Sequence, residues 1–239
     1  MKAIFIKEIK QFFNSIEGYL AIGFFFTISS LLIWLIPSEL NILINKQANL
    51  LPFFLITPWI LLILIPAITM KMISAESLQK TNILLFTKPI STWNIINAKY
   101  LASVTISLLS ILPTITYVFS IWTLSEPRGN IDFGEMTGSY IGVFLLIIAY
   151  NSIGIFASTI SKNTVICFIL SILLILFITF GLNYLGLNLN NTLIKNLSII
   201  HHYESISRGV LDIKNIIYFT SVTIIFLHLS SITINKYKS

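Results

Sequence analysis

Three side chains with acid–base and metal-binding capacity lie close together near the C-terminal end of the sequence: His201, His202 and Glu204. Imidazole and carboxylate groups bind zinc and transfer protons, but a zinc site needs at least three protein ligands in a fixed geometry. Asp212 is the one further acid nearby. The cluster therefore supports one chemical hypothesis, an enzyme in which His201, His202 and Glu204 are the working groups.

The sequence contains no other motif of a known catalytic or nucleotide-binding site. It has no G-x-x-x-x-G-K-[ST] phosphate-binding loop, no H-E-x-x-H and no G-x-S-x-G. If ATP drives the protein, another polypeptide must bind the nucleotide. The single cysteine, Cys167, excludes a disulfide framework and a cysteine-based zinc site.

The composition is that of a membrane protein. Of the 239 residues, 56% are hydrophobic and only 10% are charged, and the mean hydropathy is +0.89. Soluble domains carry about 25% charged residues. Runs of about 20 apolar residues are long enough to cross a bilayer as helices. We therefore expect an all-α membrane protein in one domain, residues 1–239, with six spans at about 19–36, 53–73, 98–123, 138–160, 163–185 and 215–234.

Charges in the loops predict the orientation of these spans. With both termini inside, ten of the fifteen Lys and Arg residues lie on the inner side, as the positive-inside rule requires. Glu8, Glu17 and Glu76 lie on the same side, and the other six acids lie outside. The net charge of +6 is thus explained by topology, and we expect no nucleic-acid partner.

Residues 2–17 form an amphipathic pattern with the period of a helix. Six apolar residues share one face, Ile4 lies off it, and the charged residues, including Glu8, lie opposite. We expect an interfacial helix that ends at Gly18, with the apolar face in the lipid and the lysines toward the cytoplasm. The face includes Phe5, Ile9, Phe12, Phe13 and Ile16.

The segment from Ser74 to Asn97 is too polar for lipid, and its pattern predicts a short helix on the inner side. Ser74 is a candidate N-cap, Glu76 suits the positive end of a helix, and Pro89 prevents its continuation. Ser91 or Thr92 can cap the next helix, which leads into the third span. Within that span, Pro113 predicts a kink. A simple solvated connector is the alternative for residues 74–90.

Polar residues within the predicted spans are few, and most of them are only weakly polar. Asn151, Gly154, Ala157 and Ser158 lie along one side of the fourth span, where small residues allow close helix packing or line a substrate path. The spans contain no carboxylate of the kind that proton-coupled transporters use. This absence argues against secondary transport.

This order of features resembles the ABC-2 type transporter permeases, and within that family the gliding-motility-associated permease subunits of Bacteroidetes. The similarity covers nearly the whole chain. Its clearest segments are FIKEIKQFFNSIEGYL (5–20), FFLITPWILLILIPAITMKMISAESLQKTNILLFTKPIS (53–91), IGIFASTISKN (153–163) and HHYESISRGVLDIKNIIYF (201–219).

The resemblance implies a permease subunit that binds no cofactor itself and works with a cytoplasmic ATPase carrying ATP and Mg²⁺. It implies a coupling helix between spans two and three that docks on this ATPase. It also implies a second permease chain, identical or similar, and a multi-pass location in the bacterial inner membrane. The coupling contact would then involve Ser74, Glu76, Ser77, Leu78, Lys80, Thr81, Leu84, Leu85 and Pro89.

The resemblance also gives a structural interpretation of the cluster formed by His201, His202 and Glu204. It implies two short re-entrant helices outside the membrane, in which no residue is catalytic or binds metal. The residues of this external loop are His202, Glu204, Arg208, Gly209 and Asp212, with Ser205. A membrane-embedded enzyme that uses His201, His202 and Glu204, and a membrane scaffold that does not transport, are the alternatives.

Overall fold

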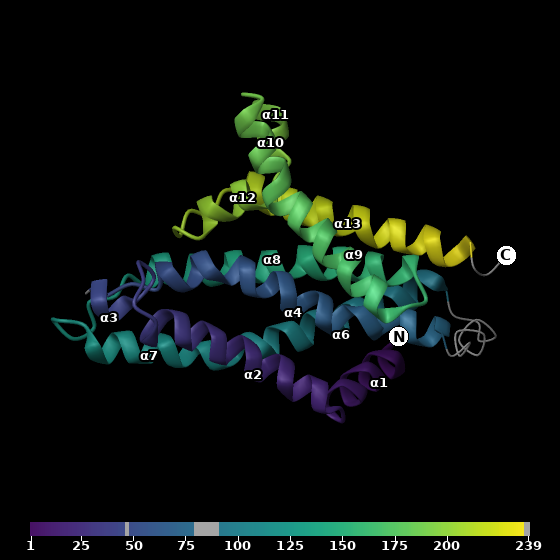
Figure 1. Ribbon diagram of the computed structural model, residues 1–239, viewed down its shortest axis with the longest axis horizontal. Coiled ribbons are helices and arrows are strands. Elements are labelled where there is room, and N and C mark those ends of the chain that lie inside the picture. Colours follow the sequence, from purple (N-terminus) through teal and green to yellow (C-terminus); the bar gives the residue numbers. More distant parts are fainter. Residues whose placement is uncertain (46–47, 79–90, 237–239) are drawn as a thin grey trace.

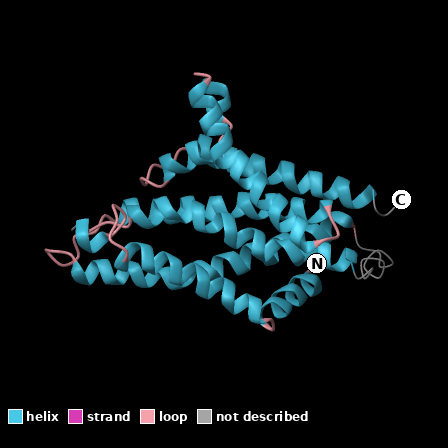
Figure 2. Ribbon diagram, viewed as in Figure 1, coloured by secondary structure: helices cyan, strands magenta, loops and turns pink. Residues whose placement is uncertain are grey.

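The computed structural model describes residues 1–45, 48–78 and 91–236, and within these ranges every regular element is helical (Figures 1 and 2). The elements in chain order are α1 (Lys2–Phe13), α2 (Ile16–Ser30), η1 (Leu31–Leu35), α3 (Ile42–Asn45), α4 (Leu51–Leu78), α6 (Thr92–Ile111), η2 (Leu112–Thr114), α7 (Ile115–Leu124), α8 (Phe133–Ile160), α9 (Thr164–Leu176), η3 (Phe177–Gly181), α10 (Leu182–Asn188), α11 (Thr192–Asn196), α12 (Ile199–Ile206) and α13 (Ile213–Lys236).

Within the part of the chain that the structure describes, six helical stretches are long and apolar enough to cross a membrane, as the sequence predicts. They are Gly18–Leu35, Leu51–Leu78, Thr92–Leu124, Phe133–Ile160, Thr164–Asn188 and Ile213–Asn235. In the most apolar windows of α4 and α8, 72% and 78% of the residues are buried, whereas the share is only 22%, 22% and 28% in the spans that contain α2, α9 and α13. Helices α4 and α8 therefore form the centre of the bundle. The all-α fold class and the number of spans are confirmed.

The third span divides at Pro113, where the sequence predicts a kink. A 3₁₀ turn, η2, separates α6 from α7. Proline lacks the N–H that an α-helix needs at this position, so the turn is its direct consequence. At the other end of the span, the Ser91 hydroxyl accepts a hydrogen bond from the Asn94 N–H, which confirms Ser91 as the N-cap.

Two predicted helix boundaries are wrong. The first helix ends at Phe13, ahead of Gly18, because the Ser15 hydroxyl accepts from the Gly18 N–H and caps α2. Ser74 does not begin a helix, because α4 continues without interruption to Leu78 and the Ser74 hydroxyl donates to the Met70 carbonyl one turn earlier. A serine that bonds back along its own helix is compatible with a helix interior. The rest of the predicted coupling helix, including Lys80, Thr81, Leu84, Leu85 and Pro89, lies outside the described residues.

Both termini lie at one end of the bundle, together with the C-terminal end of α4 and the start of α6 (Figure 1). At the opposite end lie α3, the C-terminal end of α7 and the turn after α12, and α10 and α11 project sideways from the bundle (Figure 1). Termini at the same end of the bundle are expected for a chain that crosses the membrane an even number of times.

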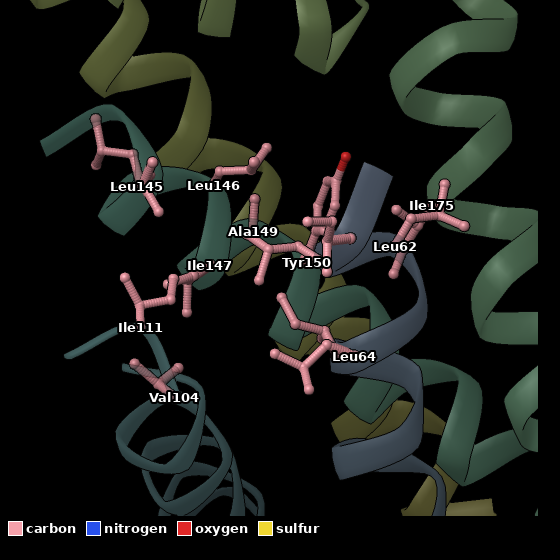
Figure 3. Packing of buried hydrophobic residues seen from close by; sticks show 14 of the residues in the cluster. Leu62, Leu64, Val104, Ile111, Leu145, Leu146, Ile147, Ala149, Tyr150 and Ile175 are labelled. Carbon is pink, nitrogen blue, oxygen red and sulfur yellow. The ribbon is translucent and has the colours of Figure 1, made fainter. Parts of the chain in front are cut away.

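In the part of the core drawn in Figure 3, aliphatic side chains from α4, α6, α8 and α9 surround the fully buried Tyr150. The Thr179 hydroxyl lies 3.0 Å from the Tyr150 hydroxyl and satisfies it. Close contact between the two central helices depends on Gly154, because a Cβ at this position would overlap the side chain of Thr69 on α4. Gly154 thus sets the distance between α4 and α8.

Replacing Gly154 by leucine is expected to destabilise the bundle, since the larger side chain must push α4 away from α8. Overpacking of this kind costs about 1–3 kcal/mol. The measurement is the thermal unfolding midpoint in detergent. Gly23 is the matched control, because a Cβ there would meet no atom within 4 Å. Equal midpoints for Gly154→Leu and Gly23→Leu would contradict the packing described.

Candidate functional site

Four charged side chains form an ion cluster at the end of the bundle where the termini lie: Lys7, Glu8, Glu76 and Lys99. Lys99 lies on α6 and its side chain is only 1% exposed. Its ammonium nitrogen is 2.8 Å from Glu8 Oε1 and 2.9 Å from Glu76 Oε2. The cluster therefore joins α1, α4 and α6 through one buried cation.

The surroundings of Lys99 use its full hydrogen-bonding capacity. An ammonium group has three N–H donors, and the third is directed at the Met72 carbonyl oxygen of α4, 2.5 Å away. Transferring an unpaired ammonium from water into a protein interior is strongly unfavourable. Two carboxylates and one carbonyl compensate for this loss, so the buried ammonium of Lys99 has all its partners only while α1 and α4 are both in place.

Lys7 balances the remaining negative charge. Its ammonium donates to Glu76 Oε1 over 2.6 Å and lies 3.7 Å from Glu8 Oε1. The pKa of Lys7 is raised: partial burial lowers it, but the hydrogen bond and charge of Glu76, with Glu8, outweigh that effect. Two cations and two anions thus form a neutral group, with Lys7 at its exposed edge.

Apolar contacts position α1 for this cluster. Ile4, one turn before Glu8, is buried in a small cluster with Ile95 and Ala98 of α6. Ile95 and Ala98 precede Lys99 by four residues and by one. The face of α1 that meets the protein therefore carries Ile4 and Glu8, which the amphipathic pattern had placed away from its apolar face.

Glu8, which the amphipathic pattern placed with the charged residues opposite the apolar face, is therefore buried in the protein, where its carboxylate is a partner of Lys99. Of the predicted apolar face, Phe5, Ile9, Phe12 and Phe13 are half-buried. Ile16 belongs to the first turn of α2 and is 78% exposed.

Sequence reasoning missed the cluster, although a signal was present. Glu8 and Glu76 are two of only three acids on the side of the membrane that the lysine-rich loops mark as inner. Acids that run against the charge bias are candidates for specific ion pairs. Ser74 is buried beside this site, Ser77 is half-buried, and Leu78 is exposed at the end of α4.

The His201–Glu204 cluster lies at the opposite end of the bundle, on α12. His202 Nε2 is 2.8 Å from the Asn196 carbonyl and Nδ1 is 2.7 Å from Asn215 Oδ1. Its ring also stacks on Tyr218, with the centroids 4.0 Å apart. His202 therefore ties α12 to α13, which leaves it poorly suited to act on a substrate.

The turn after α12 packs tightly on α8. Gly209 has a φ of +82°, and a Cβ there would lie 2.7 Å from the Cα of Glu135. The Ser139 hydroxyl donates to the Ser207 carbonyl over 2.8 Å. Both contacts hold the turn against the end of α8, and only glycine fits the first of them.

The other predicted residues of this loop have simpler surroundings. Asp212 Oδ1 accepts from the Lys214 N–H at the start of α13, whereas Glu204 and Arg208 are exposed. Ser205 is half-buried. Among the described residues, no three His, Cys, Asp or Glu side chains lie close enough to hold a metal ion.

The small and polar residues of the fourth span are all buried in α8. The Asn151 amide donates to the Ser107 hydroxyl of α6 over 3.1 Å and to the Ile147 carbonyl over 2.9 Å. Gly154 faces Thr69 of α4, and Ala157 and Ser158 continue the same buried region. Their surroundings in this chain are those of packing residues.

Comparison with known families identifies a family to which the chain belongs. A family model described as "ABC-2 family transporter protein" matches residues 2–234. The match extends from α1 to α13 and includes both the ion cluster and the external loop. No curated protein matches the chain.

Replacing Lys99 by methionine is expected to lower the unfolding midpoint markedly, because Glu8 and Glu76 would remain together with only Lys7 to balance them. Removing one partner of a buried ion pair costs about 3–5 kcal/mol. Adding Glu8→Gln restores neutrality and should recover much of the loss. Lys10→Met, at an exposed position of α1, is the control. No recovery in the double variant would contradict the charge balance described.

His202→Ala is expected to destabilise the external end, because it removes two hydrogen bonds and the stacking contact with Tyr218. We expect a loss of about 1–3 kcal/mol, measured by thermal unfolding. His201→Ala is the adjacent control. If the two variants unfold at the same temperature, the bridging role of His202 is wrong.

Proposed function

Since this chain belongs to the ABC-2 family of transporter proteins, we propose that it is a permease subunit driven by a separate cytoplasmic ATPase that binds ATP and Mg²⁺. The observation that carries the proposal is the ion cluster. It joins α1 to the end of α4 and to the start of α6, the two helices that residues 79–90 connect. These residues contain most of the predicted coupling helix.

The cluster gives this coupling a physical basis. An ATPase that moves the segment between α4 and α6 acts on two helices that Lys99 links through Glu76 and the Met72 carbonyl. Separating these groups would leave a buried charge unpaired, which is strongly unfavourable. The ends of α4 and α6 therefore move together, and α1 moves with them through Glu8.

ATP supplies the free energy that makes this movement productive. A ligand shifts a protein between two conformations only by the difference in its affinity for them. Closure of the ATPase subunits on ATP would favour one arrangement of the spans, and hydrolysis would release it. In this scheme Lys99 and its partners transmit movement and take no part in hydrolysis.

The excess of lysines and arginines in the loops supports the cytoplasmic location of the cluster, with both termini inside. Six spans provide half of a transport pathway, so the working unit would contain a second permease chain, identical or similar. The proposed location is the bacterial inner membrane. Similarity to gliding-motility-associated permeases supports a finer proposal, that the complex exports material to the cell surface.

The coupling proposal is tested by affinity purification of the tagged protein from its native membranes, followed by mass spectrometry. The wild type is expected to retain a soluble ATPase subunit, and Leu84→Asp is expected to lose it, because a charge in an apolar docking contact weakens binding. Glu76 is left unchanged, since it belongs to the ion cluster.

Leu193→Asp is the matched control. Leu193 is 74% exposed on α11, at the other end of the bundle, so this variant should retain the ATPase. The absence of any ATPase from the folded wild type, or its equal retention in Leu84→Asp, would contradict the proposal.

A further inference from the structure

A helical hairpin, formed by α10, the turn at Asn190 and α11 (residues 182–196), stands away from the rest of the bundle between its two ends (Figure 1). The main contacts of α10 and α11 are with each other and with η3 and α12, their neighbours in the chain. The two helices approach closely at Gly186, where a Cβ would lie 2.6 Å from the backbone nitrogen of Lys195. The rest of the hairpin surface is open to the surroundings of the bundle.

The base of the hairpin lies within the membrane-crossing part of the bundle. The Ser198 hydroxyl, just after α11, donates to the Thr179 carbonyl over 2.6 Å, and the Thr179 hydroxyl donates to that of Tyr150, near the middle of α8. Beside Thr179, the ring of Phe180 stacks on Trp59, with the centroids 4.0 Å apart. Trp59 lies about 12 Å from the start of α4, at the rise of an α-helix. Since the hairpin leaves the bundle sideways from this level, a single copy of the protein would place it among acyl chains.

The exposed surface of the hairpin does not suit acyl chains. Its tip carries the exposed side chains of Asn188, Asn190 and Asn191. Within the part of the chain that the structure describes, the amides of Asn188 and Asn190 have no hydrogen-bond partner. An unpaired amide in hydrocarbon is strongly unfavourable. Non-helical backbone, such as the turn at Asn190, is tolerated at this depth only where protein or a water-filled cavity covers it.

The same surface does not suit water either, because most of it is apolar. Water would surround large side chains that a folded protein buries, and their removal from water is favourable. Protein is the cover that satisfies both parts, since it offers apolar contacts and hydrogen bonds together. Five large apolar side chains of the hairpin are between 40% and 74% exposed: Tyr184, Leu185, Leu187, Leu189 and Leu193.

A second copy of this chain matches the hairpin in polarity and in charge. A side-chain amide contains both donors and an acceptor. The asparagines of two identical hairpins can therefore bond to one another across a two-fold axis, as polar residues do between membrane helices. Residues 182–194 contain no charged side chain, so two copies meet there without repulsion.

We propose that the α10–α11 hairpins of two copies of this chain pack on one another within the membrane. Their leucines are in contact, and the amides of Asn188 and Asn190 are hydrogen-bonded across the interface. The inference rests on the second permease chain of the proposed function and identifies that chain as a second copy of this one. The paired hairpins join the two halves of the pathway through η3 and α12.

The first experiment places the photo-crosslinking residue p-benzoylphenylalanine at Leu193, in native membranes that contain two differently tagged copies of the chain. Irradiation is expected to yield a product that carries both tags. Phe119 is the matched control: it is 67% exposed on α7, within the third span, and should not yield this product. A crosslink from Leu193 only to a different protein, no crosslink to protein at all, or equal yields at both positions would overturn the proposal.

The second experiment measures association in liposomes, by energy transfer between copies with different fluorescent labels as lipid is added. Asn188→Leu combined with Asn190→Gly removes both amides, and glycine fits the φ of +48° at residue 190. The association constant should fall about tenfold, about threefold for each amide. Asn130→Leu, exposed between α7 and α8, should leave it unchanged. Unchanged association in the double variant, with an unfolding midpoint equal to that of the wild type, would overturn the proposal.

Leu193→Asp separates this inference from the proposed function. Its charge lies in the paired surface, so the variant should lose the second copy, but its coupling segment is intact and it should retain the ATPase. Retained ATPase with unchanged association would overturn the pairing and leave the proposed function in place. Lost association in this variant, together with a wild type that holds no ATPase, would support the pairing and contradict the proposed function.

Discussion

The arrangement of the helices at one end of this protein depends on a single buried ammonium group. Lys99 lies within a membrane-length helix, and there it must have acceptors for all three of its N–H groups. Glu8, Glu76 and the Met72 carbonyl meet this requirement from two other helices. The amphipathic N-terminal helix is therefore an internal part of the bundle at this point.

The opposite end is held together by a different kind of contact. There the backbone of the turn after α12 approaches α8 at Gly138 and Gly209, and the Tyr203 hydroxyl donates to the Phe54 carbonyl of α4 over 2.7 Å. These contacts are short and uncharged and involve fixed backbone. Buried ion pairs hold helices through charge that must stay paired, whereas glycine contacts hold them through shape. The two ends of the bundle thus differ in the interaction that fixes them.

The sequence was sufficient for the spans and for the break at Pro113, because hydropathy and proline geometry act locally. It was not sufficient for the roles of Glu8 and Ile4, because the helical period shows which residues share a face but not which face meets another helix. The prediction that Ser74 is an N-cap was wrong for a related reason. A serine hydroxyl can cap a helix or donate to a carbonyl one turn earlier in the same helix, and the sequence alone does not show which of the two occurs. In the sequence, His202 was a candidate acid–base or metal-binding residue. Its hydrogen-bond partners lie on α11 and α13, which only the folded structure brings next to it.

The order in which the chain is made gives the buried ammonium a further consequence. Glu8 and Glu76 are synthesised before Lys99, and chains emerge from the ribosome with the N-terminal part first. Until the third span arrives, the two carboxylates lack the cation that the finished bundle provides. Lys7 alone can pair with them until then, and the contacts of Lys99 that join the N-terminal helix, the end of α4 and the start of α6 form only after α6 has been made.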